Sequence, residues 1–271
     1  MRVHQLGDGD PDVAVVAGVH GDEPCGERAV ERLLADPPAV SRPVKFVVAN
    51  ELAADRGVRY VDEDLNRAFP GDPGATSHEA RLAAELEREL DGCTTLALHS
   101  TQSYGDPFAL VDDVDEETAA ICADLGIDAV VETGPFADGR LISYPRTVEV
   151  ECGYQGSDSA ADNALRLVRE FLDATGVVPS TSTPREVPVF RFTGRVAKPT
   201  GREEYEVFAE NFERVAEGET FAAADGDPWV AEEAFYPILM SPYGYERVFG
   251  YAGERVGPVA EIAGPEASAD D

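Results

Sequence analysis

Two histidines and a glutamate stand where they can bind one metal ion together. His20 and Glu23 lie three residues apart, between an apolar run at 13–16 and a helical pattern that begins at residue 25. His99 ends a second apolar run, at 96–98. Two imidazoles and a carboxylate are typical ligands of hydrolytic zinc sites, which leave a fourth position for water. The sequence therefore predicts a site for one Zn²⁺ per chain.

A hydrolytic metal site also needs a base, and the segment 148–153 offers two. Glu149 and Glu151 are two residues apart in a predicted strand, so their side chains share one face. Either carboxylate, projecting near the end of that strand, could take a proton from water. The alternative is that both are solvated acids on an edge strand, since glutamate pairs are common in so acidic a chain.

Arginines in a long connection between residues 50 and 74 suggest an anion-binding function. Arg56, Arg59 and Arg67 lie there, and Asn66 precedes the last of them. A guanidinium binds a carboxylate through two parallel hydrogen bonds, and an asparagine amide adds a donor. The alternative is that these arginines neutralise the acidic residues at 62–64. Connections of this length in compact domains are usually functional.

The remaining histidines and the cysteines carry less information. His4 has no comparable context, and His78 is expected to be a solvated residue in the first turn of an acidic helix. The four cysteines are widely spaced, which favours reduced thiols over a disulfide framework or a structural zinc site. We expect each of them to be a small buried hydrophobic residue.

The elements that must position these residues alternate between strand and helix patterns. His20 and His99 each follow an apolar run. If these runs are parallel strands of one sheet, their carboxyl ends lie at the same edge and bring the two histidines together. This alternation predicts an α/β fold, a mixed, mostly parallel sheet with helices on both faces. Strands are predicted at Val13–Val19, Val44–Ala49, Thr94–His99, Asp128–Glu132 and Thr147–Cys152, and helices at Cys25–Ala35, Ser77–Leu90, Glu116–Leu125 and Ser157–Ala174.

A change of pattern near residues 177–185 suggests a domain boundary. The segment Pro-Ser-Thr-Ser-Thr-Pro interrupts the helical pattern there, and short alternating runs follow at 187–197, 207–212 and 235–240. We therefore predict a catalytic domain at 1–178 and a small C-terminal all-β domain at 179–271.

Composition limits the class of protein. The chain has 271 residues, of which 43% are hydrophobic, which is enough for an ordinary globular core. Its 53 acidic and 22 basic residues give a net charge of −31. Such a chain should repel nucleic acids and anionic membranes. A disordered acidic protein is the alternative, but the regular patterns favour a folded protein adapted to high salt.

Four motifs, taken in order, resemble those of the succinylglutamate desuccinylase/aspartoacylase family within the zinc carboxypeptidase superfamily. His20-Gly21-Asp22-Glu23 looks like the family's H-G-x-E zinc motif, and His99 in Leu-His-Ser-Thr looks like its third ligand. The segment 64–67 is similar to the D-L-N-R motif, and 151–153 resembles the E-x-G motif that holds the catalytic glutamate. The trailing β domain also fits the family's architecture, which is zinc-carboxypeptidase-like.

The resemblance implies a role for each matched residue. His20, Glu23 and His99 would hold Zn²⁺, and Glu151 would be the general base. Arg59 would stabilise the oxyanion, and Asn66 and Arg67 would bind the carboxylate of the amino acid. The implied reaction is hydrolysis of an N-acyl amino acid to a carboxylate and a free amino acid.

Three positions depart from the family pattern. Glu149 also fits a segment that leads into the catalytic acid and is a rival to Glu151. Arg140 lies near an arginine that binds a second substrate carboxylate in aspartoacylase-like members. Tyr236 lies beside the expected place of a tyrosine that contacts substrate. Arg140 and Tyr236 are thus candidate substrate-binding residues, and the acyl group stays open.

Two other functions remain as alternatives to an N-acyl amino acid deacylase. One is a metallocarboxypeptidase acting on short peptides, and the other is a non-catalytic protein that binds a metal or a carboxylate. We expect a small-molecule partner, an N-acyl amino acid, and the sequence leaves open whether the chain forms a homo-oligomer. No apolar run approaches the roughly 18 residues of a membrane span, and the N-terminus shows no signal-peptide pattern, so a cytoplasmic location is expected.

Overall fold

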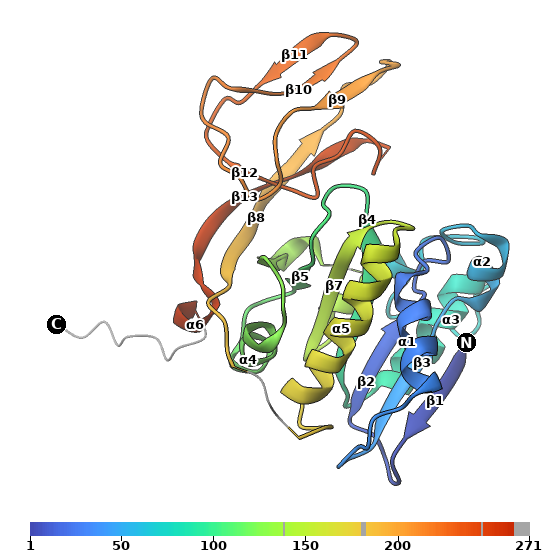
Figure 1. The fold of residues 1–271 in the computed structure, drawn as a ribbon. Helices are drawn as coiled ribbons and strands as arrows, with labels where there is room; N and C mark the ends of the chain where they lie inside the picture. The colour runs from blue at the N-terminus through green and yellow to red at the C-terminus, as the bar shows by residue number, and fades with distance from the viewer. Residues whose placement is uncertain (138, 180–182, 245, 263–271) are drawn as a thin grey trace.

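A ten-stranded mixed sheet is the central element of the molecule (Figure 1). The computed structural model describes residues 1–137, 139–179, 183–244 and 246–262. The strands are β1 (Arg2–Leu6), β2 (Val13–Ala17), β3 (Val44–Val48), β4 (Thr94–Thr101), β5 (Phe108–Val111), β6 (Val130–Glu132), β7 (Thr147–Tyr154), β8 (Pro188–Ala197), β9 (Tyr205–Val207), β10 (Thr220–Ala224), β11 (Asp227–Val230), β12 (Tyr236–Ile238) and β13 (Val248–Pro258). The helices are α1 (Cys25–Ala35), α2 (Glu51–Arg56), α3 (His78–Leu90), α4 (Glu116–Asp124), α5 (Asp158–Ala174) and α6 (Val259–Ile262), with 3₁₀ turns η1 (Leu65–Arg67), η2 (Gly134–Phe136) and η3 (Leu141–Ser143).

The order of strands in the large sheet is β1-β3-β2-β4-β7-β5-β6-β8-β13-β12. Strands β3, β2, β4 and β7 run parallel to one another, so their carboxyl ends meet at one edge. Strand β5 is antiparallel to β7, and β6 and β8 continue the sheet in parallel with β5. The predicted mixed, mostly parallel sheet is confirmed.

Helices cover both faces of this sheet, as the alternation of patterns predicted. Along β2, Val13 and Val15 belong to the core cluster beneath α1 and α5, whereas Ala14 and Val16 belong to the cluster beneath α3. Because both faces of the strand are buried, its apolar run is continuous rather than alternating. The four predicted helices match α1, α3, α4 and α5 to within one residue at each end.

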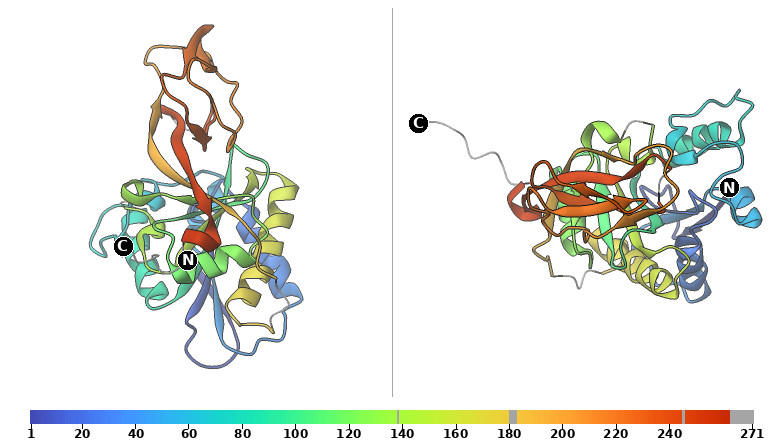
Figure 2. Two further views of the ribbon diagram at one scale, coloured as in Figure 1. Left: turned by 90° about the vertical axis from the view of Figure 1, so that its left-hand side faces the viewer. Right: turned by 90° about the horizontal axis from the view of Figure 1, so that it is seen from above.

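The C-terminal segment does not stand apart from the large sheet. Strand β8 pairs in parallel with β6, and β13 and β12 extend the same sheet beyond it. The rest of the segment forms a small antiparallel sheet, β11-β10-β9, at the far end of the molecule (Figures 1 and 2). A small C-terminal β module is therefore present, while its division from the catalytic domain at residue 178 stays a prediction.

The connection between residues 50 and 74 is more regular than its sequence suggested. It contains the short helix α2 and the turn η1. Asn50 caps α2 by accepting a hydrogen bond from the Ala53 amide, and Gly57 ends the helix in a left-handed conformation. These are ordinary capping residues. The connection thus contains two short helical elements although its sequence shows little regular pattern.

Among the described residues, no helix is both long and apolar enough to traverse a bilayer.

Candidate active site and metal centre

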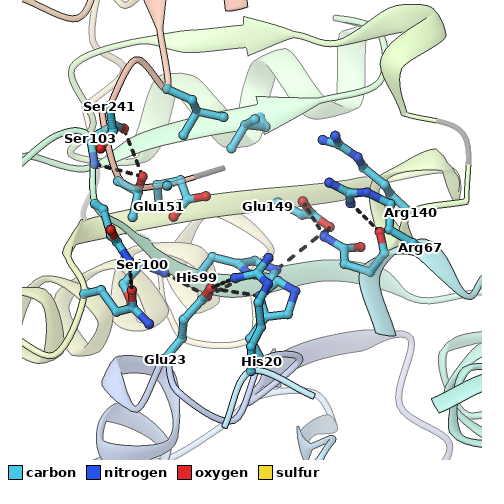
Figure 3. Close-up of a pocket in the computed structure, with 18 residues that line it drawn as sticks. His20, Glu23, Arg67, His99, Ser100, Ser103, Arg140, Glu149, Glu151 and Ser241 are labelled. Carbon is cyan, nitrogen blue, oxygen red and sulfur yellow. Dashed lines mark hydrogen bonds and ion pairs between the residues drawn. The ribbon is translucent and has the colours of Figure 1, made fainter. Parts of the chain in front are cut away.

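His20, Glu23 and His99 converge at the carboxyl edge of the parallel strands (Figure 3). Each offers one ligand atom, and these three atoms lie within 4.8 Å of one another. His20 follows β2, and Glu23 lies just before Pro24, the N-cap of α1. His99 lies near the end of the neighbouring strand β4. All three side chains are buried, each no more than 4% exposed. The order of β2 and β4 in the sheet brings together residues that are 79 positions apart.

The glycine between the first two ligands is required by close packing. A Cβ atom on Gly21 would lie 2.2 Å from the carbonyl carbon of Ala53 in α2, so no larger residue fits there. The Gly21 amide also donates a hydrogen bond to the Arg59 carbonyl, at 3.1 Å. The turn that carries His20 and Glu23 is thus held against the connection that carries Arg59.

The donor set fits a divalent cation. The Glu23 Oε1 atom lies 2.9 Å from His20 Nδ1, and its Oε2 atom lies 3.1 Å from His99 Nδ1. Among the described residues, His20 Nδ1 and His99 Nε2 have no hydrogen-bond partner of good geometry, although both are buried. Buried polar atoms nearly always have partners, so ring nitrogens left without one beside a carboxylate are consistent with ligands of an ion. Two imidazoles and a carboxylate are a donor set typical of zinc.

Charges around the cluster are predominantly negative. Burial alone would lower the pKa of His99, but its hydrogen bond with Glu23 and the nearby carboxylates of Glu149 and Glu151 raise it to about 10. Burial likewise raises the pKa of Glu23, yet the two imidazoles outweigh it and hold that pKa well below its usual range. The arrangement therefore favours a positive charge at its centre.

Asp64 orients the first histidine, a role that sequence analysis missed. Its Oδ1 atom lies 3.0 Å from His20 Nε2 and also accepts a hydrogen bond from the Asn66 amide. A carboxylate on one ring nitrogen fixes the tautomer and leaves the other nitrogen as the ligand. Asp64 was considered only as a charge partner of arginines. Its position in the D-L-N-R segment was the available signal.

The two candidate bases share one face of β7, as period-two alternation requires. Strand β7 is central in the sheet rather than an edge, and Glu149 is only 4% exposed. This rules out the alternative of solvated edge acids. Glu149 accepts hydrogen bonds from the Asn66 side chain at 3.2 and 3.4 Å and lies 3.9 Å from His99 Nε2.

Glu151 is held differently from Glu149. It pairs in register with His99, and its Oε2 atom is buried without a hydrogen-bond partner among the described residues. The pKa of Glu151 is raised to about 7. Burial is the largest cause, and repulsion from the Glu23 carboxylate is the second. A carboxyl group with such a pKa can exchange a proton near neutral pH.

Arg59 and Asn66 lie beside the cluster rather than at its centre. Arg59 donates a hydrogen bond from Nη1 to Glu23 Oε1 at 2.9 Å and forms an ion pair with Asp64. Asn66 donates to Glu149 and accepts from the Leu141 amide, at 3.0 Å. The alternative that these arginines neutralise neighbouring acids therefore holds in part, for Arg59 and Asp64.

The other predicted substrate-binding residues occupy different places. Arg67 and the buried Arg140 line the cavity above the cluster, and Arg140 donates a hydrogen bond from Nη2 to the Tyr251 hydroxyl of β13. Tyr236 does not line this cavity, because its ring packs against Phe190, with centroids 5.2 Å apart. Its contact with substrate stays a prediction that this geometry does not support.

The cavity has two chemically different sides (Figure 3). Arg67 and Arg140 lie on one side, and Ser103 and Ser241 lie on the other together with Glu151. Ser241 belongs to the C-terminal segment, so both parts of the chain contribute to the lining.

Glu79 anchors the connection that carries Arg59 and Asp64. It lies in the first turn of α3, is fully buried, and accepts hydrogen bonds from the amides of residues 61, 62 and 63 and from the Asn50 side chain. Its carboxylate thus replaces the missing backbone partners of an irregular segment. Sequence analysis did not identify Glu79, because an acid in the first helical turn is usually exposed.

His78 and the four cysteines lie outside the metal cluster. His78 is half-buried and its Nε2 atom lies 3.2 Å from Asn50 Oδ1, so the prediction of a solvated residue was wrong. All four cysteines are free and buried, as predicted.

A family model described as the succinylglutamate desuccinylase/aspartoacylase catalytic domain matches residues 9–174. An N-acyl-aromatic-L-amino acid amidohydrolase (carboxylate-forming) of Xenopus tropicalis is 36% identical over 121 residues, which cover 36% of this chain and 39% of the relative. A succinylglutamate desuccinylase of Pseudomonas aeruginosa is 40% identical over 86 residues, or 30% of this chain and 26% of the relative. The chain thus matches well under half the length of these curated relatives.

Solved structures share the fold over most of the chain. The product-bound ectoine utilization protein EutE (DoeB) from Ruegeria pomeroyi superposes with a TM-score of 0.76 at 20% identity, covering 93% of this chain and 88% of the other. Murine aminoacylase 3 has a TM-score of 0.71 at 23% identity, with coverage of 92% and 97%. At these identities the likeness establishes the fold, including the small C-terminal β module.

Proposed function

Because the chain belongs to the succinylglutamate desuccinylase/aspartoacylase family, we propose that it hydrolyses the amide bond of an N-acyl amino acid in a zinc-dependent reaction. The products are a carboxylate and a free amino acid. The observation that carries this proposal is the cluster of His20, Glu23 and His99, whose ligand atoms lie within 4.8 Å of one another. Glu151, with its buried Oε2 atom, lines the same cavity. Relatives named as amidohydrolases and desuccinylases support the same reaction class.

His20, Glu23 and His99 are the residues that would hold one Zn²⁺ per chain. When bound, the ion supplies a Lewis acid and makes water a competent nucleophile near neutral pH. Asp64 holds the His20 ring in the orientation that this binding requires, through the contact at 3.0 Å.

Glu151 acts as general base and then as general acid. Its carboxylate accepts a proton from the attacking water as the new C–O bond forms at the amide carbon. It then delivers that proton to the amide nitrogen as the C–N bond breaks, so the amine leaves neutral. Its burial raises the pKa of this carboxyl and so favours retention of the proton between the two steps. Glu149 is the less suitable base, because Asn66 already holds its carboxylate.

Arginines bind the two negative charges of the reaction, the one that develops on the carbonyl oxygen and the one on the α-carboxylate. Arg59, next to Glu23, stabilises the negative charge that develops on the carbonyl oxygen. Arg67, assisted by Arg140 on the same side of the cavity, binds the α-carboxylate of the amino acid. Asn66 contributes by fixing Glu149 and the start of η3.

Zinc content and two matched variants test this proposal. We expect elemental analysis to find one zinc per chain, and a panel of N-acetyl, N-formyl and N-succinyl amino acids to include a substrate. The variant Glu151→Gln should retain zinc and lose about 10²–10⁴-fold in kcat, whereas Glu149→Gln should lose less. Full activity in Glu151→Gln would transfer the base role to Glu149. A chain without zinc or hydrolysis would refute the proposal, and comparable turnover of a tripeptide would favour a metallocarboxypeptidase.

A further inference from the structure

The two sides of the cavity differ in charge. The arginine side holds the guanidinium groups of Arg67 and Arg140. The opposite side, which we call the acyl side, holds Ser103 and Ser241 beside Glu151 (Figure 3). The two serine hydroxyls are uncharged, and the Glu151 carboxyl is acidic, so the labelled residues of this side include no cation.

A second cavity of about 480 Å³ continues from the acyl side. It shares Gln102, Ser103 and Ser241 with the first cavity and extends between the segment 102–106 and the C-terminal segment. Among the described residues that line it, Asp106 and Glu210 are charged and both are acidic; none is a lysine, arginine or histidine. The nearby Lys198 is bound to the Pro242 carbonyl at 2.7 Å, and its ammonium group lies over the rings of Tyr205 and Phe249.

The orientation of a substrate follows from this asymmetry. Every N-acyl amino acid carries its α-carboxylate on the amine side of the scissile bond. That carboxylate belongs with the arginines, so the acyl carbon and its substituents must extend past the metal cluster toward the acyl side. A second carboxylate at the end of the acyl group would lie near Glu151 and would approach Asp106 and Glu210. A carboxylate placed near these three acidic side chains, with no cationic partner, is disfavoured by like-charge repulsion.

We propose that the acyl group of the substrate is uncharged and that it binds on the acyl side, beside Ser103 and Ser241. This proposal rests on the proposed hydrolysis of N-acyl amino acids and specifies which of them are substrates. Any second carboxylate of the substrate then belongs to the amino acid, where Arg140 and Arg67 can both engage it. A desuccinylase would need the opposite arrangement, with a cation on the acyl side.

A matched pair of substrates tests this proposal directly. N-butanoyl and N-succinyl derivatives of one L-amino acid have acyl chains of four carbons and differ in the terminal carboxylate. We expect kcat/KM to be at least tenfold higher for the butanoyl compound in the zinc-loaded protein, at one ionic strength. Equal or faster hydrolysis of the succinyl compound would overturn the proposal.

Two variants locate the acyl group within the cavity. Ser241→Arg should raise the succinyl/butanoyl ratio of kcat/KM at least tenfold, whereas Ser241→Gln, similar in length but uncharged, should leave it within about twofold. Ser103→Arg repeats the test from the other chain segment in case one variant does not fold. An unchanged ratio in the folded arginine variants would show that the acyl group binds elsewhere.

Binding without turnover separates this proposal from the proposed function. Calorimetry on zinc-loaded Glu151→Gln should show tighter binding of the butanoyl than of the succinyl compound. If the wild-type protein hydrolyses neither compound but this preference is found, the hydrolase proposal fails and the assignment of the acyl side stands. Preferential binding of the succinyl compound would refute the assignment whether or not hydrolysis occurs.

Discussion

Acidic residues of the same chemical type have different roles in this site, because their surroundings differ. Glu23 lies between two imidazoles, and Glu149 is held by an asparagine amide. The buried Oε2 atom of Glu151 has no hydrogen-bond partner in the part of the chain that the structure describes. The pKa of Glu23 is held low by the two imidazoles, and that of Glu151 is raised to about 7 by burial. A carboxyl group with a raised pKa in a cavity beside a metal cluster is typical of a proton-transferring residue.

At the residue scale, Asp64 offers the clearest test of metal binding. Asp64→Asn removes the carboxylate that faces His20 Nε2 at 3.0 Å, so the ring loses the partner that fixes its tautomer. We expect zinc affinity to fall about 10–100-fold, as is common when such a partner is lost. Competition with a chelator of known affinity measures this. Asp55→Asn, the same change at an exposed position of α2, should leave affinity unchanged, and an equal loss there would contradict the explanation.

The sequence was sufficient to identify the residues of the metal cluster but not their supporting contacts. His20 and His99 could be identified because each follows an apolar run, and parallel strands must bring such positions to one edge. Glu79 could not, because in a chain with 53 acidic residues one more acid carries little information. Asp64 was marked by its place in the D-L-N-R segment, but its contact with His20 was not predicted. Their roles depend on burial against a segment distant in the chain, which no local pattern records.

At the scale of elements, helix α3 fixes the active-site connection as well as covering the sheet. Its Glu79 accepts three backbone hydrogen bonds from residues 61–63, next to Asp64. Burial raises the pKa of Glu79, but these hydrogen bonds and that of Asn50 outweigh it, so the pKa in the folded protein lies below the usual 4.5.

Glu79→Gln should destabilise the protein by about 1–3 kcal/mol at pH 7, because the amide cannot accept all of these hydrogen bonds. An acid whose pKa is lowered by folding contributes stability above its unfolded pKa and loses it as pH falls through the folded value. The difference between wild type and variant should therefore shrink below pH 4.5. Urea unfolding at several pH values measures it. Glu85→Gln, exposed on the same helix, is the control, and a pH-independent difference would refute the role of the charge.

Elements with strong local patterns were predicted well, and the missed ones have identifiable reasons. Strand β13, which was not predicted, contains glycines at 250, 253 and 257. A Cβ atom on Gly250 would lie 2.6 Å from the Leu239 carbonyl oxygen, so this glycine permits close packing. Strand β5 has only four residues and pairs antiparallel to β7, which an alternation of strands and helices does not suggest.

At the scale of the whole molecule, the net charge of −31 dominates the behaviour in solution. Repulsion among so many carboxylates destabilises the compact state unless salt screens it, and the screening length falls from about 10 Å at 0.1 M to about 3 Å at 1 M. We expect the melting temperature to rise between these concentrations of KCl. Sucrose at equal osmolality, which does not screen charge, should raise it less. A melting temperature that is the same at both salt concentrations would refute adaptation to high salt.

The backbone pairing of β6 with β8 has a mechanical consequence. Residues 130–132 and 189–191 form one ladder, so the part of the chain that supplies Ser241 is continuous with the sheet that carries the metal ligands. Swinging one half away from the other would rupture that ladder. This pairing therefore opposes a rigid-body separation of β8 from the sheet that carries the metal ligands.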